Sequence, residues 1–522
     1  MNAAIRNLMN RNMDRREFLK LSAVLPPSIY FARSSRNPGR FIQNPAAENV
    51  LIVVFDALSA ENISLYGYRR ETMPNLARIA ERATVYHNHH AGGNYTTPGT
   101  ATLLTGSYPW THRAVKMGHE VIGERERKNI FSAFDQYYRI AYAHNSFADV
   151  FLRQFSASLD LHKPQLDLYL NNELALDRFF ENDYDLASVA WERSVKRNES
   201  GYSYSLFFSS LYEEYSQGKI KDLSDIFPKG IPHTGSDNYF LLEQGIDWLM
   251  SQVSQIPQPF LGYFHFLPPH APYSPRRDYD GTFRDDGVGY LIEKPKSIFG
   301  GRENVNLRLQ SRERRSYDEY ILYADGELGR LYDFLDASGL LENTWLVFTS
   351  DHGEMMERGI YKHITPVMYE SLLHIPLLII EPGQERRKDV YSLTSAVDVL
   401  PTLLKVTGQE LPDWVEGQVL PLFSDASPDP ERSVYAVEAK LSEEGGPLFP
   451  VTAAVLKDGY KLVYFSGYEE LGNAGSYLEL FDLENDPEEL NNLYDAKSSR
   501  SQELLKELME KIRAADRPYL KS

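Results

Sequence analysis

Apolar residues along the chain are gathered into short runs that predict buried strands. The first run, Asn49 to Phe55, is rich in β-branched residues and is followed directly by Asp56. An uninterrupted apolar run is typical of a central parallel strand that is covered on both faces. Similar runs occupy residues 260–266, 345–351 and 375–380.

Segments with helical periodicity, such as residues 316–335, lie between these runs. Alternating strand and helix patterns predict an α/β fold with a central, mostly parallel sheet flanked by helices. We place this α/β domain at residues 48–427. In open α/β sheets the functional residues gather at the carboxyl ends of the strands.

Two other segments have a different pattern. Residues from about 150 to 218 are dense in aromatics, acids and leucines without a clear strand, and we interpret them as a helical insertion. Beyond residue 428, short strand-like runs and a final amphipathic helix predict a smaller C-terminal α+β subdomain at 428–522. The runs are 433–439, 451–456, 461–465 and 477–482, and the helix is 501–512.

Residues 1–47 are expected to form a targeting segment and linker. The stretch from Asp14 to Lys20 contains Arg15 and Arg16 and resembles a twin-arginine export signal. The apolar stretch that follows is short, contains two prolines and lacks a clear cleavage site. We expect an extracytoplasmic location, periplasmic or at the cell surface, with a cytoplasmic location as the alternative.

Composition narrows the function classes. The 522 residues, 42% of them hydrophobic, are enough for a large core, and no later apolar run reaches the ~18 residues of a membrane span. A formal net charge of -18 disfavours nucleic acid and anionic membranes as partners. The chain has no cysteine, which excludes disulfides, thiolate metal sites and cysteine nucleophiles.

Acids at strand ends are the first candidate site residues. Asp56 closes a buried strand, where a carboxylate is costly unless a cation meets it, and a metal ion would do so. Asp351 and His352 follow another strand and can both turn toward one cation. The alternatives are a helix-capping role for Asp56 and a simple turn with a hydrogen-bonded imidazole for His352.

Thr96 is the candidate nucleophile. It stands just before Pro98, in a segment that predicts the start of a helix, and proline is well tolerated in the first helical turn. The positive end of the helix dipole there would stabilise an alkoxide or a covalent anion. Taken alone, a threonine in this position is more often a helix N-cap.

Three further cationic groups follow strands or precede them. His270 lies among prolines that stiffen the chain after the run 260–266, whereas His265 lies within that run and is expected to be a core residue. Lys362 and His363 form a compact pair able to meet an oxyanion. A solvated surface lysine is the alternative for Lys362.

Taken in order, these segments resemble the sulfatase branch of the alkaline phosphatase superfamily, over nearly the whole chain after residue 48. The matching segments are Asn49–Asp56, Leu65–Tyr68, Thr72–Leu76, Thr96–Gly106, His270–Pro272, Thr349–Gly353, Val397–Leu403 and Leu480–Glu489. The resemblance implies an alkaline phosphatase-like fold and an enzyme that acts on an anionic ester.

The departures from the sulfatase pattern carry information of their own. Formylglycine sulfatases need Cys-x-Pro-x-Arg or Ser-x-Pro-x-Arg, but this chain has Thr96 as the first residue and Thr100 in place of the arginine. The family's usual Asp-Asp pair is also missing, because Ala57 follows Asp56. In its threonine the chain is more similar to phosphoryl-transferring members of the superfamily.

By this resemblance, Asp56, Thr96, Asp351 and His352 would hold one divalent ion, which could be Mn, Zn, Mg or Ca. Thr96 would attack a phosphate ester and form a phosphothreonine that water or an acceptor alcohol resolves. His270, Lys362 and His363 would supply positive charge and the leaving-group proton. The alternatives are a sulfuric ester hydrolase and a non-catalytic binding protein that kept the fold.

Overall fold

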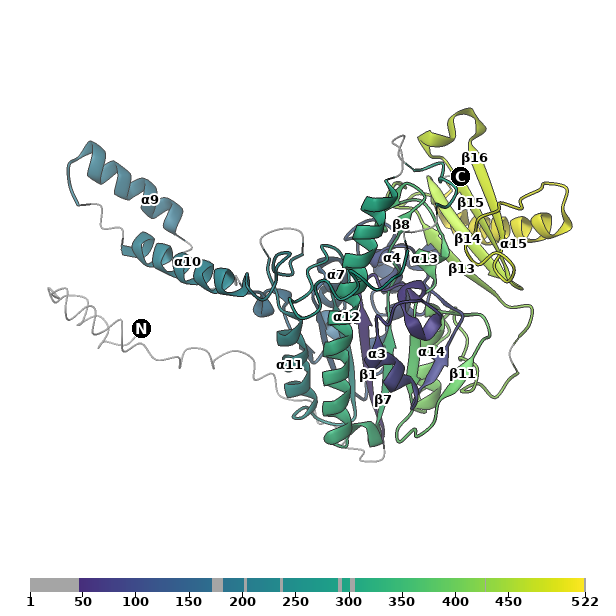
Figure 1. Cartoon of the computed structure of the whole chain (residues 1–522), viewed down its shortest axis with the longest axis horizontal. Coiled ribbons are helices and arrows are strands. Elements are labelled where there is room, and N and C mark those ends of the chain that lie inside the picture. Colours follow the sequence, from purple (N-terminus) through teal and green to yellow (C-terminus); the bar gives the residue numbers. More distant parts are fainter. Residues whose placement is uncertain are drawn as a thin grey trace. The chain divides into compact units, whose positions relative to one another are not determined.

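The apolar runs lie at the centre of an eight-stranded sheet in the computed structural model (Figure 1). The structure describes residues 47–170, 182–200, 204–234, 238–289, 293–300, 306–427 and 429–520. All of them belong to one unit, Gln43–Ser522. The strand order is β11 (Lys388–Val390), β2 (Thr84–Tyr86), β10 (Leu377–Ile380), β7 (Thr344–Thr349), β1 (Asn49–Phe55), β6 (Phe260–Phe266), β4 (Tyr138–Ala143) and β5 (Leu161–His162).

The central strand β1 is buried on both faces, as its unbroken apolar sequence predicts. Leu51, Val53 and Phe55 belong to a core formed with α3 (Pro74–Ala80), α11 (Leu242–Val253) and α12 (Leu307–Ala337). The alternate residues of β1 belong to a second core, formed with α4 (Thr96–Thr105), α6 (Ile130–Ala133), α7 (Ser146–Gln154) and α14 (Val399–Val406). The predicted α/β class is therefore confirmed.

Strand register brings distant segments of the chain to one edge of the sheet. In the parallel pairs, Phe55 of β1 faces Phe266 of β6, and Val54 of β1 faces Thr349 of β7. Strand β4 is parallel to β6, with Ala143 opposite His265. The residues that follow these four strands therefore lie close together. Strand β10 is the exception in direction, because it is antiparallel to both β7 and β2.

Helix α4 approaches this edge closely. All ten of its residues are buried. A Cβ atom on Gly99 would lie 2.2 Å from the backbone oxygen of Asp351, so only glycine fits there. This contact holds the first turn of α4 against the loop that follows β7.

Within the described residues of the segment 150–218, helices predominate, including the end of α7, then α9 (Asp183–Trp191) and the start of α10 (Tyr204–Leu223). The segment also holds one strand that the sequence pattern does not reveal, because β5 pairs in parallel with β4 at the edge of the sheet. A two-residue strand is too short to show an alternating pattern in the sequence.

The C-terminal part forms a separate four-stranded antiparallel sheet in the order β13 (Ser433–Glu438), β14 (Val451–Lys457), β15 (Tyr460–Ser466) and β16 (Ser476–Asp482). Helix α15 (Ser499–Asp516) contributes Leu504, Leu508 and Ile512 to the core under this sheet. The predicted α+β subdomain is thus present. The backbone N–H of Val437 in β13 donates to the carbonyl of Gly92, which lies just before α4.

A buried ionic cluster also connects the two parts. The ammonium of Lys461 in β15 lies 2.7 Å from Glu370 and 2.6 Å from Glu489. Glu370 begins α13 (Glu370–Leu373) and also contacts His90 of β3 (His89–His90), which pairs with β12 (Thr394–Ser395). The short hairpin β8 (Met356–Glu357) and β9 (Ile360–Tyr361) precedes α13.

In the part of the chain that the structure covers, no helix combines the length and apolar character needed to cross a bilayer. The segment that resembles a twin-arginine signal lies outside the described residues.

Candidate active site

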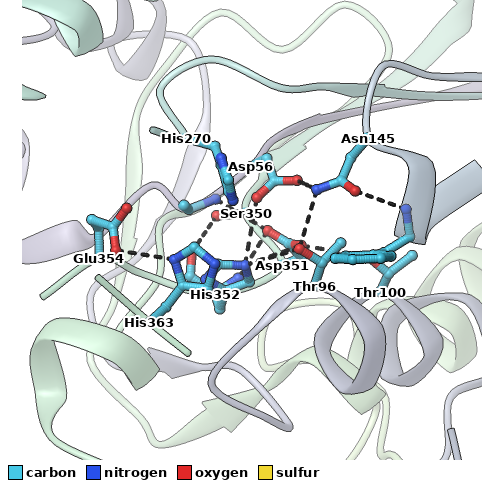
Figure 2. Close-up of polar contacts among 12 residues, drawn as sticks. Asp56, Thr96, Thr100, Asn145, His270, Ser350, Asp351, His352, Glu354 and His363 are labelled. Carbon is cyan, nitrogen blue, oxygen red and sulfur yellow. Dashed lines mark hydrogen bonds and ion pairs between the residues drawn. The ribbon is translucent and has the colours of Figure 1, made fainter. Parts of the chain in front are cut away.

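Asp56 lies at the end of β1, fully buried (Figure 2). Its Oδ2 accepts a hydrogen bond from Asn145 Nδ2 at 2.5 Å and lies 3.0 Å from His265 Nε2. Its Oδ1 has no hydrogen-bond partner among the described residues. Asp56 therefore does not act as a helix cap, and one of its oxygens is left for another ligand.

Asp351 and His352 follow β7 and are also fully buried. Asp351 Oδ1 accepts from the backbone N–H groups of Ala57 and His352, at 3.3 and 3.0 Å. His352 Nδ1 lies 2.8 Å from the carbonyl of Gly353. Because a carbonyl only accepts, Nδ1 carries a proton, and Nε2 faces the site.

Thr96 is the first residue of α4, and the N-cap position belongs to Tyr95. The Thr96 hydroxyl therefore does not cap the helix. Its Oγ1 lies 3.4 Å from His352 Nε2 and accepts a hydrogen bond from Asn145 Nδ2 at 3.2 Å. The hydroxyl thus sits at the positive end of α4, between His352 Nε2 and an amide donor.

Two carboxylates face each other in this buried site. Burial raises the pKa of Asp351, and the charge of Asp56 raises it further. Burial also opposes ionisation of Asp56, but His270, His265 and His352 outweigh it and hold the pKa of Asp56 well below its usual value. For His352, burial lowers the pKa, yet the two carboxylates raise it to about 9. The site therefore favours positive charge between the carboxylates.

The donor set fits a divalent metal ion. One ligand atom from each of Asp56, Asp351 and His352 lies within 4.8 Å of the others. Two carboxylate oxygens and one imidazole nitrogen suit Mn, Zn or Mg, and Asp56 Oδ1 has no hydrogen-bond partner among the described residues. The Thr96 hydroxyl contacts the same imidazole nitrogen, so it can be the fourth ligand.

The predicted cationic groups are only partly brought together. The ring of His363 lies 4.4 Å from that of His352 and 4.8 Å from that of His270, measured between ring centroids. His363 Nδ1 contacts Glu354 at 3.0 Å, and Glu354 also accepts a hydrogen bond from Tyr273. Lys362 is exposed, and its ammonium makes no hydrogen bond or ion pair with any residue that the structure describes.

Sequence reasoning missed Asn145 and underestimated His265. Asn145 Oδ1 accepts from the backbone N–H of Phe147 at the start of α7, which directs the amide nitrogen toward Asp56 and Thr96. Asn145 follows β4, so its place at a strand end was the available signal. His265 is buried as expected, but it contacts Asp56 and its Nδ1 contacts Tyr263 at 3.0 Å.

Comparisons with known proteins agree with this geometry. The model of the family described as Sulfatase matches residues 48–409, and the model described as N-sulphoglucosamine sulphohydrolase, C-terminal, matches residues 357–517. The chain is 25% identical to "Uncharacterized sulfatase YidJ" of Escherichia coli over 494 residues, covering 90% of this chain and 89% of that protein.

One further relative in sequence and one solved structure are also similar to this chain. The "Multifunctional alkaline phosphatase superfamily protein PehA" of Trinickia caryophylli is 24% identical, covering 85% of this chain and 91% of that protein. The phosphonate monoester hydrolase of Agrobacterium radiobacter superposes with a TM-score of 0.64 at 20% identity, covering 91% of this chain and 96% of that one. The family match spans most of the chain and includes the loops that carry Asp56 and Asp351. The chain therefore belongs to the sulfatase family, the ester-acting hydrolases of the alkaline phosphatase superfamily.

Proposed function

We propose that this chain hydrolyses or transfers a phosphate ester, with Thr96 as the nucleophile. The position of the Thr96 hydroxyl supports this most directly, because it touches His352 Nε2 and Asn145 Nδ2 at the first turn of α4. Similarity to a phosphonate monoester hydrolase and to a multifunctional superfamily member agrees with chemistry at phosphorus.

Asp56, Thr96, Asp351 and His352 would hold one divalent ion. Such an ion would lower the pKa of the threonine hydroxyl and neutralise charge on the ester. Asn145 donates to the attacking oxygen and to Asp56, and so orients both. The covalent phosphothreonine is attacked in turn by water or by an acceptor alcohol.

His270 and His363 are our proposed proton donors for the leaving group, with Glu354 orienting His363. Lys362 is proposed to contact the ester oxygens, because an exposed side chain of this length can reach an incoming anion. Segment 150–218 and the C-terminal subdomain would determine which alcohol is accepted. We also propose that residues 1–47 direct the protein out of the cytoplasm.

A sulfatase activity is the second candidate, favoured by the names of the relatives. The side chain at position 96 argues against it. A sulfated formylglycine hydrate can expel sulfate by collapsing to an aldehyde, whereas a sulfated threonine has no such route. Phosphothreonine can be attacked in line by water once its oxygens are neutralised.

The test compares matched esters. With metal-loaded enzyme, we expect kcat/KM for a phosphate diester or monoester to exceed that for the matched sulfate by at least about 100-fold, or ~2.7 kcal/mol in transition-state binding. Mass spectrometry of the peptide that contains Thr96 should show a phosphate adduct after acid quenching. Faster turnover of the sulfate ester would restore the sulfatase assignment.

A further inference from the structure

A cavity of about 700 Å³ beside the proposed catalytic site is lined by several cationic side chains, although the chain is acidic overall. It lies between the segment that follows β1, the first turns of α12 and the loop after β7. Its cationic lining residues are Arg69, Arg70, Arg284, Lys294, Arg314 and Arg315. Such a grouping is unexpected in a chain with a formal net charge of -18.

Two of these cations are already paired with carboxylates. Arg70 Nε lies 2.6 Å from Asp286, and its Nη1 lies 2.8 Å from Asp318. Lys294 contacts Glu357 and Glu488. These two side chains therefore complete the wall of the cavity and are not available to a ligand.

The other four arginines have no such partner. Within the described residues, no carboxylate oxygen lies within 4.0 Å of the guanidinium groups of Arg69, Arg284, Arg314 and Arg315. The Arg314 guanidinium stacks on the ring of Tyr68 at 4.8 Å, and Arg315 Nη1 donates to the carbonyl of Arg284. These contacts hold Arg314 and Arg315 while leaving other N–H donors of their guanidinium groups free for an oxyanion, and the side chains of Arg69 and Arg284 are exposed.

Four carboxylates also line the cavity, and none of them pairs with the four arginines. Glu357 and Glu488 are both engaged by Lys294. Glu354 is engaged by His363 and Tyr273. For Glu61, burial raises the pKa to about 8, with Lys294 opposing the shift, so this side chain is mainly protonated at neutral pH. The cavity therefore presents unpaired guanidinium groups to its contents.

We infer that this cavity binds a tetrahedral oxyanion, a sulfate or phosphate group that is either free or carried by the substrate. Several guanidinium forks around one space match the geometry of such a group. Glu354 forms a wall that the cavity shares with the proposed catalytic site, because its carboxylate also contacts His363. The binding itself does not depend on the chemistry at Thr96.

The first test is titration calorimetry of the metal-loaded full chain with inorganic sulfate. We expect the double variant Arg314→Gln/Arg315→Gln to weaken one sulfate site by at least about tenfold, since each guanidinium contributes charge-assisted hydrogen bonds. The matched control is Arg312→Gln, which removes an exposed arginine of the same helix that does not line the cavity. Equal sulfate affinity in all three proteins, or no sulfate binding by the wild type, would overturn the proposal.

A second variant guards against misfolding of α12. Arg69→Gln/Arg284→Gln changes two exposed side chains outside that helix and should weaken the same site. The source of the anion is then assigned by kinetics. If the anion belongs to the substrate, the variants should raise KM about tenfold for an ester with a second anionic group but not for a singly charged ester. If the bound anion is a free ion, the variants should change KM for the two esters equally. Sulfate should then raise Tm only in the wild type and in the Arg312→Gln control.

Discussion

Thr96 carries its hydroxyl on the first turn of α4, where no cap interaction ties it to the helix. Thr96→Ala should therefore lower kcat by at least about 10³-fold, because a nucleophile cannot be replaced by water in the same position. Its Tm should stay within a few degrees of the wild type, since no cap is lost. Thr96→Ser, which keeps the hydroxyl, is the matched control, and wild-type turnover by the alanine variant would rule out the nucleophile.

The role of Asn145 was recognised from the structure and not from the sequence. Its amide donates to both Asp56 and Thr96, so Asn145→Ala should lower kcat about 100-fold while bound metal, measured by elemental analysis, stays at wild-type stoichiometry. Asn145→Ser keeps an oxygen for the N–H of Phe147 but loses the two donors. Equal losses in both variants would assign the effect to these donors. Full activity in the serine variant would instead assign it to the helix cap.

At the scale of elements, the packing of α4 on the loop that follows β7 is a tight constraint. A Cβ on Gly99 would lie 2.2 Å from the backbone oxygen of Asp351. The backbone of α4 and the backbone of the loop cannot move apart without a cost in free energy. Gly99→Ala should reduce the free energy of unfolding by about 1–3 kcal/mol or more and lower metal affinity. Both are measurable by thermal melts with and without added metal.

Gly218→Ala provides the control for this substitution. Gly218 lies in α10, and a Cβ there meets nothing within 4 Å. This variant should be neutral or stabilised by up to about 1 kcal/mol, because alanine favours helix. Unchanged metal affinity in Gly99→Ala would show that α4 can move away from the loop without disturbing the ligands.

The buried lysine of β15 connects two elements through charge. Lys461 is fully buried between Glu370 and Glu489, so Lys461→Met would leave Glu489 without its cation and Glu370 with only His90. We expect a loss of about 3–5 kcal/mol in chemical denaturation. Lys405→Met, which breaks an exposed pair with Asp425, should leave stability nearly unchanged. Similar losses in the two variants would contradict a special role for the buried cluster.

The central strands and the long helix α12 could be predicted from the sequence because their patterns are local. An apolar run such as 49–55 reports burial on both faces directly. The antiparallel direction of β10 could not be predicted, since direction depends on the path of the loops. The contacts of Asn145 and His265 with Asp56 are likewise set by strand register between segments about 90 and 210 residues apart in sequence.

At the scale of the whole molecule, location decides which esters the enzyme meets. If Arg15 and Arg16 form an export signal, replacing both with lysine should retain the protein in the cytoplasm of a host with twin-arginine export. Cell fractionation with a cytoplasmic marker measures this. If the variant is exported like the wild type, or if the wild type stays in the cytoplasm, the two arginines do not form an export signal.

The bond from Val437 in β13 to Gly92 makes the C-terminal sheet a support for the chain that leads into α4. A Cβ on the next residue, Gly93, would lie 3.3 Å from the carbonyl of Val437, so the two backbones are in close contact. A chain cut near residue 427 would therefore lose this support behind Thr96, its proposed nucleophile. Chimeras that exchange this sheet between relatives should be active only when the new β13 places a backbone N–H at the position of Val437, within reach of the Gly92 carbonyl.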